Sequence, residues 1–247
     1  MAMTPPDWSV IHKQEFTAGS CWKDSSCYCC VNNHPDFSFQ LLPSNGTTLL
    51  YMEGEYDFLK KTGQVLEKTA DGKPPQFFSF EFGGPKPLNI FHTPCYLAGL
   101  CEGVIQKPLL CKLYPFIPVL DTDGALETIV PASIYDITFD ILGASSPCSV
   151  FDQQAEYFQR WSTLPAEIQS LQHPSIILYL QAIKFFVQSY EKKVKACKEL
   201  QGLSGKKFWS KWELLYLGRK LVDTERLRID VKKTYLDLEK KFGEFLC

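Results

Sequence analysis

Cysteines are the residues of this chain whose type and spacing are best suited to chemistry. Of the ten cysteines in the sequence, eight lie within its first 148 residues. Three of these fall between Cys95 and Phe116, where prolines and glycines should prevent a single helix or strand from running through. Thiolates on a turn-rich backbone can converge on one metal ion or cluster. The sequence therefore predicts a metal centre with eight candidate ligands. They are Cys21, Cys27, Cys29, Cys30, Cys95, Cys101, Cys111 and Cys148.

The ligand types leave the metal open between two classes. Zinc takes four ligands, so eight cysteines are enough for two zinc sites. The same soft thiolates are equally able to hold iron, or one iron–sulfur cluster with extra ligands or redox partners. A set of thiolates without an obligate histidine is typical of iron–sulfur clusters, which we therefore place first, with zinc as the alternative. His34 and His92 lie near the cysteines in sequence, and each is a candidate ligand or acid–base group, although an ordinary loop histidine is the simpler interpretation.

Composition and charge exclude several classes of protein. With 247 residues, 45% of them hydrophobic and 14% aromatic, the chain should fold as a globular protein. A net charge of -2 gives no basic surface, so we expect no nucleic-acid partner. No apolar run reaches membrane-spanning length, and residues 1–10 lack the pattern of a signal peptide. We therefore expect a cytoplasmic protein with no membrane partner, in which clustered cysteines bind metal and do not form disulfides.

The elements that must position the cysteines predict an α+β fold. Acidic residues early and lysines late indicate a helix over 49–62, and alternating apolar residues indicate a short, irregular β region. After residue 150 apolar residues recur at helical spacing. We therefore predict a cysteine-cluster metal-binding domain over 1–150 and a helical C-terminal extension over 151–247, packed on it. The predicted strand pairs are 76–82 with 88–91 and 110–120 with 125–130; 134–142 is extended or mixed; the later helices are 151–161, one from Pro165, 176–200, 208–222 and 227–245.

One ten-residue segment carries a resemblance to a known family. It reads Lys107-Pro-Leu-Leu-Cys111-Lys-Leu-Tyr-Pro-Phe116, and Cys101 precedes Cys111 by nine intervening residues. The segment resembles the YkgJ-type cysteine-cluster family of zinc- or iron-chelating domains, whose C-x9-C pair ends in (R/K)-P-x-x-C-(R/K)-x-(F/Y)-P-F. The adjacent Cys29-Cys30, the Gly54-Glu55 element and Cys148 have counterparts in the family. The resemblance covers about residues 20–165 and implies metal chelation, but no known reaction.

Several side chains near the cysteines are candidates for a supporting role. Glu55 either contacts the centre or is simply an acid in the first turn of a helix. Lys107 and Lys112 either offset the negative charge of the thiolates or are solvated surface lysines. Tyr114 and Phe116 are expected to form a dry wall around the site.

Two classes of function stay open at this point. The centre either serves a metal-dependent enzyme or electron carrier, acting on a small molecule or peptide, or it holds together a non-catalytic binding or metal-handling module. A catalytic site keeps an open coordination position and a structural site does not. The spacing of cysteines does not distinguish the two, and the sequence contains no nucleotide-binding loop or hydrolase motif.

Overall fold

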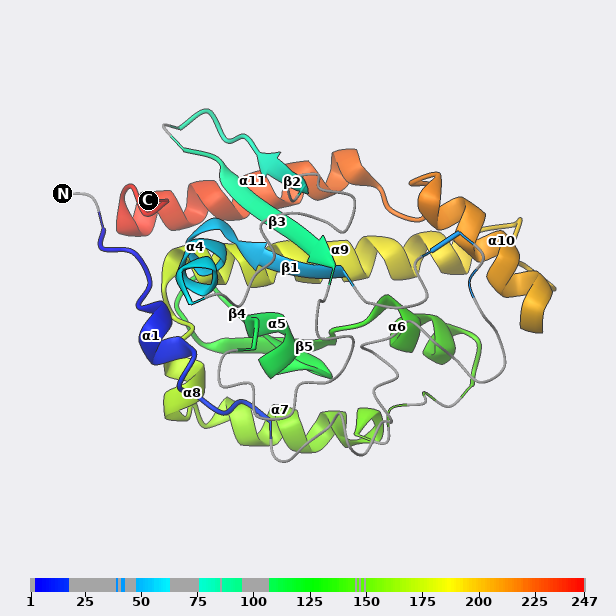
Figure 1. Cartoon of the computed structure of the whole chain (residues 1–247), viewed down its shortest axis with the longest axis horizontal. Coiled ribbons are helices and arrows are strands. Elements are labelled where there is room, and N and C mark those ends of the chain that lie inside the picture. Colours follow the sequence, from blue (N-terminus) through cyan, green and yellow to red (C-terminus); the bar gives the residue numbers. More distant parts are fainter. Residues whose placement is uncertain are drawn as a thin grey trace.

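A computed structural model describes residues 3–17, 39, 41–42, 48–62, 76–84, 86–94, 107–144, 146, 148 and 150–246. Within these ranges, small antiparallel sheets and a helical C-terminal part form the predicted α+β fold. The long helix α9 (Pro174–Ala196) crosses the middle of the molecule (Figure 1). Helix α11 (Thr224–Phe242) and a three-stranded sheet lie on one side of it, and a two-stranded hairpin lies on the other. No helix in the described ranges is long and apolar enough to span a membrane.

The three-stranded sheet is antiparallel and has the order β1-β3-β2, with β1 at Thr48–Met52, β2 at Gln76–Phe80 and β3 at Leu88–Pro94. The predicted pairing of β2 with β3 is confirmed. The predicted helix over 49–62 is wrong in its first part, because α4 begins only at Glu53 (Glu53–Lys61). The preceding residues pair with β3 as strand β1, and Leu49 and Tyr51 bury one face of that strand.

The second predicted pair of strands is present, but its first strand is shorter than predicted and a helix precedes it. Residues Leu109–Leu113 form the short helix α5, and only then do β4 (Phe116–Leu120) and β5 (Leu126–Pro131) pair antiparallel. Leu109 and Leu113 are fully buried four residues apart, which is the spacing of one helix face and not of a strand. The prediction of a strand from residue 110 is therefore wrong for the residues before Phe116. The predicted pairing of the two strands from Phe116 onward is confirmed.

Helix α6 (Ile134–Ile141) occupies the segment predicted to be extended or mixed, so that prediction is also wrong. The Ser133 side chain caps the start of this helix by accepting the N–H of Tyr135 at 3.1 Å. Ile137 and Phe139 of the helix are buried in the core.

Helices make up the C-terminal part, as predicted. A short 3-10 turn, η1 (Phe151–Gln153), leads into α7 (Gln154–Ser162), and the predicted helix after Pro165 is the short α8 (Ala166–Gln169). Beyond α9, the chain forms α10 (Gly205–Leu217) and then α11. At the N-terminal side, α1 (Trp8–Ile11) is a single turn.

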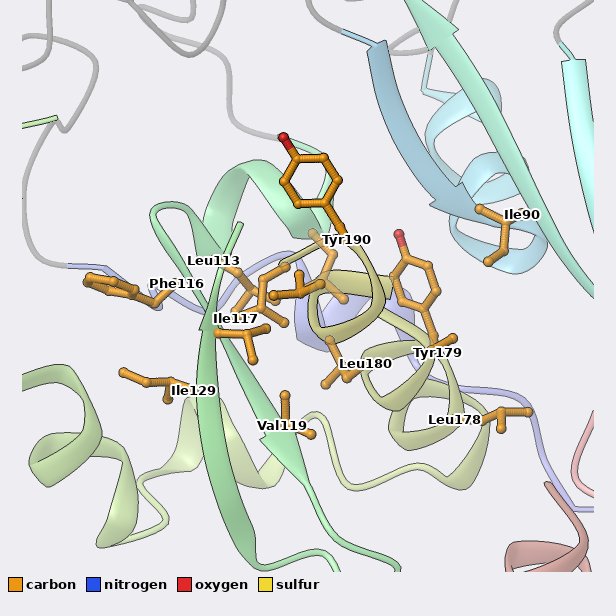
Figure 2. Packing of buried hydrophobic residues seen from close by; sticks show 14 of the residues in the cluster. Ile90, Leu113, Phe116, Ile117, Val119, Ile129, Leu178, Tyr179, Leu180 and Tyr190 are labelled. Atoms are coloured by element: carbon orange, nitrogen blue, oxygen red, sulfur yellow. The ribbon is translucent and has the colours of Figure 1, made fainter. Parts of the chain in front are cut away.

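The hydrophobic core extends through both halves of the chain around α9. Figure 2 shows α9 between two layers, with Leu180 beside Val119 of β4 and Tyr179 on the side of Ile90 of β3. The core cluster continues from Trp8 to Phe245, so side chains from before and after residue 150 pack together. The division into a metal-binding domain and an extension stays a prediction.

Candidate metal centre

The structure describes two of the eight predicted ligands, Cys111 and Cys148. Cys111 lies on α5 and is half-buried, and Cys148 follows α6 and is only 2% exposed. Within the described ranges, no three His, Cys, Asp or Glu side chains form a group that could hold a metal ion. The other predicted ligands lie outside the described residues, as does His34. They are Cys21, Cys27, Cys29, Cys30, Cys95 and Cys101.

The Cys111 side chain packs against a cluster formed by Leu49 and Tyr51 of β1 together with Tyr56 and Leu59 of α4. Strand β3 ends at Pro94, which is paired with Thr48 of β1. The strand that leads directly into Cys95 therefore ends beside β1, which contributes to the cluster around Cys111.

A buried carboxylate holds the first residue of α5. Glu55 of α4 is 0% exposed, and its Oε1 accepts the backbone N–H of Leu109 at 2.5 Å. Such a bond satisfies one of the N–H groups that every helix leaves without an internal partner at its start. The sequence placed Glu55 correctly in the first turn of α4, but its carboxylate serves a different helix 54 residues further along.

The N-terminal segment packs behind Glu55. The His12 ring stacks on Phe58 and brings Nε2 to 3.4 Å from Glu55 Oε1, which is an ion-pair distance without hydrogen-bond geometry. Neither ring nitrogen of His12 nor Glu55 Oε2 has a hydrogen-bond partner among the described residues. Gly54 allows Trp8 of this segment to lie close to α4, because an added Cβ at Gly54 would be 2.9 Å from Trp8 Nε1.

A second buried carboxylate lies at the other end of α5. Asp136 of α6 is 0% exposed, and its Oδ2 accepts the Tyr114 hydroxyl at 3.1 Å. Its Oδ1 accepts the Ser146 hydroxyl at 2.5 Å, and Ser146 Oγ in turn accepts the Cys148 N–H at 3.1 Å. We call these residues, with the N-terminal anchor of the helix, the α5 frame. Its members are Glu55, Leu109, Tyr114, Asp136, Ser146 and Cys148.

Burial sets the protonation of the two acidic groups in this network. It raises the pKa of Asp136 to about 6, although the hydrogen bonds from Ser146 and Tyr114 act in the opposite direction. Burial also raises the pKa of the Cys148 thiol, against the hydrogen bonds that it receives. Without a cation nearby, Cys148 is therefore held as the neutral thiol. A bound metal favours the thiolate, so binding at Cys148 would release a proton.

The other side chains that the sequence suggested as ligands or supports of the centre lie in different surroundings. Lys112 Nζ donates to the backbone carbonyl of Gln14 at 2.6 Å, and burial lowers the pKa of this lysine. Lys107 is half-buried just before α5. His92 is half-buried on β3 between Leu50 and Gln76, and burial lowers its pKa. Phe116 is fully buried against the rings of Phe151 and Tyr157.

The sequence reading missed Asp136, Ser146 and His12. A signal for Asp136 was present, because Ser133-Ile-Tyr-Asp136 before an apolar run is the Ser-x-x-Asp pattern of a helix start. Only the serine of this pattern has its expected role, because Ser133 caps the helix. The Asp136 carboxylate instead accepts hydrogen bonds from Tyr114 and Ser146. No local pattern indicates those partners.

The described part of the chain fits a thiolate centre in the chemistry of its donors. Cysteine thiolates are soft ligands, suited to zinc, iron and iron–sulfur clusters. Metal-binding side chains are usually held by surrounding hydrogen bonds, and Cys148 has such support at its N–H, which Ser146 accepts. No protein family, curated protein or solved structure matches the chain. The resemblance to the YkgJ-type family stays a prediction.

Proposed function

We propose that this chain is a metal-binding cysteine-cluster protein, whose thiolates hold an iron–sulfur cluster or iron, with zinc as the alternative. One observation carries the proposal: the described segments that adjoin the cysteines are attached to α5 or to its neighbours. Lys112 of α5 holds Gln14, seven residues before Cys21. Asp136 accepts from Tyr114, directly after α5, and from Ser146, whose Oγ accepts the Cys148 N–H. The end of β3 leads into Cys95 beside β1, which contributes to the cluster that packs on Cys111.

The surroundings of the two described candidate ligands, Cys111 and Cys148, also support the proposal. An ordinary core cysteine needs no polar partners, because it packs as a small hydrophobic residue. Cys148, in contrast, is buried among hydrogen-bonding groups. Cys111 is only half-buried on a helix that is anchored near both ends, by Glu55 and by Tyr114. A ligand needs both a fixed position and an accessible sulfur, and this arrangement suits that purpose.

The residues that support the thiols have assigned tasks in this proposal. Glu55 fixes the start of α5 and with it the position of Cys111. Ser146 accepts the Cys148 N–H and is itself held by Asp136. Cys111 and Cys148, together with the six cysteines outside the described ranges, are the candidate ligands. The metal would supply Lewis acidity as zinc or electron transfer as iron. A metal-dependent activity on a small molecule or peptide and a purely structural or metal-handling role both remain compatible with this centre.

The test is the metal content of the full-length chain purified without oxygen. Iron, zinc and acid-labile sulfide are measured per chain, together with the visible absorption spectrum. We expect iron with matching sulfide and a coloured protein, or else stoichiometric zinc in a colourless one. A well-folded chain that contains neither metal, and takes up neither on reconstitution, contradicts the proposal.

Cysteine variants locate the centre within the chain. Cys111→Ser and Cys148→Ser should lower the metal content, whereas Cys197→Ser is the matched control. Cys197 is also partly buried, but it caps the C-terminal end of α9, away from α5. Equal metal content in all three variants would exclude Cys111 and Cys148 as ligands. Far-UV circular dichroism of each variant separates a lost ligand from a lost fold.

A further inference from the structure

We infer that Asp136 is a positioning residue for Cys148, acting through the hydroxyl group of Ser146, and that its bond to Tyr114 ties this network to the end of the helix that carries Cys111. The inference rests on the proposed metal-binding function and goes beyond it, because it assigns a task to a carboxylate that is not itself a ligand. It accounts for a buried acidic side chain among the apolar residues of α6.

Asp136 uses its two carboxylate oxygens to connect Tyr114 with the segment that carries Cys148. Oδ2 accepts the Tyr114 hydroxyl at 3.1 Å. Oδ1 accepts the Ser146 hydroxyl at 2.5 Å, and Ser146 Oγ accepts the Cys148 N–H at 3.1 Å. The carboxylate therefore fixes the backbone of Cys148 through Ser146, and its bond to Tyr114 ties this backbone to the residue that follows α5.

Tyr114 connects this network to Cys111. It follows α5 directly, lies three residues after Cys111 and is 8% exposed. Because the Asp136 carboxylate accepts from both Tyr114 and Ser146, a shift of this carboxylate would change how the end of α5 and the Cys148 segment are held relative to each other. Metal sites tolerate only about 0.2 Å of error in ligand distances, so a rigid connection between two ligands has a direct use.

Simple stabilisation does not account for a carboxylate at this place. Removing a charged group from water costs several kcal/mol, and a well-packed apolar side chain often serves stability equally well. Asp140 provides the contrast, because it lies on the same helix one turn later and is exposed to solvent. It is therefore the matched control for substitutions at Asp136.

The experiment titrates the full-length chain, freed of metal under reducing conditions, with cobalt(II) alone as the probe. Thiolate ligands to cobalt give charge-transfer absorption that reports their number and geometry. Asp136→Asn and Tyr114→Phe should each weaken cobalt binding about 10- to 100-fold and change the charge-transfer band. Asp140→Asn should match the wild type in both. Tyr114→Phe removes a single oxygen atom, so it remains informative if Asp136→Asn does not fold.

A double-variant comparison separates positioning from a general structural effect. If Asp136 acts through Cys148, adding Asp136→Asn to Cys148→Ser should cause no further loss of cobalt affinity. An undiminished further loss overturns the inference, as does wild-type binding by both Asp136→Asn and Tyr114→Phe. In those cases a wild-type chain that contains metal leaves the proposed function intact. A wild-type chain that neither contains metal nor binds cobalt overturns both.

Discussion

Around α9, Ile176, Leu178 and Leu180 are all 0% exposed, and apolar side chains of β4 and β3 cover the helix from two sides (Figure 2). Around α5, in contrast, two fully buried carboxylates contact the helix start and the residue that follows the helix end. The difference reflects length. A helix of 23 residues presents a large apolar surface for packing, but one of five residues is marginal by itself and needs specific anchors.

The two carboxylates of the α5 frame also differ from each other. Both oxygens of Asp136 accept hydrogen bonds. Glu55 Oε2 and both nitrogens of His12 lack partners in the described part of the chain. Buried polar groups are nearly always hydrogen-bonded, so the Asp136 end of the frame is a completed network and the Glu55 end is an incomplete one.

The largest expected effect tests the apolar side of this comparison. Leu180→Ala should reduce the free energy of unfolding by about 2–5 kcal/mol, because it leaves a cavity in the apolar core around α9. Leu217→Ala on α10 is the control, since that side chain is 46% exposed and its loss should cost less than about 0.5 kcal/mol. Urea unfolding measures both. Similar losses at the two leucines would mean that the α9 core is not the main source of stability.

The next effect concerns the polar anchor of α5. Glu55→Ala should cost about 1–3 kcal/mol, because it leaves the buried Leu109 N–H without an acceptor. Hydrogen exchange at the Leu109 amide should accelerate at the same time. Glu53→Ala is the matched control, since Glu53 lies in the same first turn of α4 but is exposed. Unchanged exchange at Leu109 in Glu55→Ala would show that α5 is positioned by packing, like α9.

A smaller effect is expected where the N-terminal segment meets α5. Lys112→Met keeps the aliphatic stem but removes the bond from Nζ to the Gln14 carbonyl, at a cost of about 1 kcal/mol. Limited proteolysis should then cut residues 3–17 faster than in the wild type. Lys61→Met, at the exposed end of α4, should leave the cleavage rate unchanged. Equal cleavage of the two variants would remove Lys112 from the contacts that hold this segment.

The smallest expected effect is a dependence of the unfolding free energy on pH, caused by His173 at the start of α9. His173 caps α9 by accepting the Ser175 N–H at Nδ1, while Nε2 lies 2.9 Å from the Thr4 carbonyl. Burial lowers the pKa of His173 below its ordinary value of 6.5, so the folded protein favours the neutral ring. The unfolded chain therefore binds the proton first as the pH falls. Stability from this residue is complete above about pH 6.5 and is lost progressively below it.

The variant His173→Asn isolates this contribution, because asparagine also caps helices but does not titrate. Unfolding free energies at about pH 8 and about pH 5.5 are compared for the two proteins, so that the titration of other groups cancels. The wild type should lose more stability than the variant on acidification. Parallel losses would mean that the folded and unfolded states bind the proton at His173 equally.

Regular patterns in the sequence determined the parts of this fold that depend on local spacing. The apolar residues of α9 and α11 recur at helical intervals, and the alternation around Gln76–Phe80 predicted its pairing with β3. The grouping of eight cysteines and the Lys107–Phe116 motif likewise identified α5 as the region to examine. These features are visible because each depends on residues only a few positions apart.

Tertiary structure alone decided the contacts that give the candidate centre its form. Residues 49–52 became a strand because β3 supplied a partner, although their local pattern was compatible with a helix. Glu55 reaches Leu109 across 54 residues, and Tyr114 reaches Asp136 across 22. Whether a carboxylate lies in solvent or in the core depends on what folds over it from elsewhere in the chain. The sequence therefore indicated the cysteines, and the fold decided which side chains hold Cys111 and Cys148 in place.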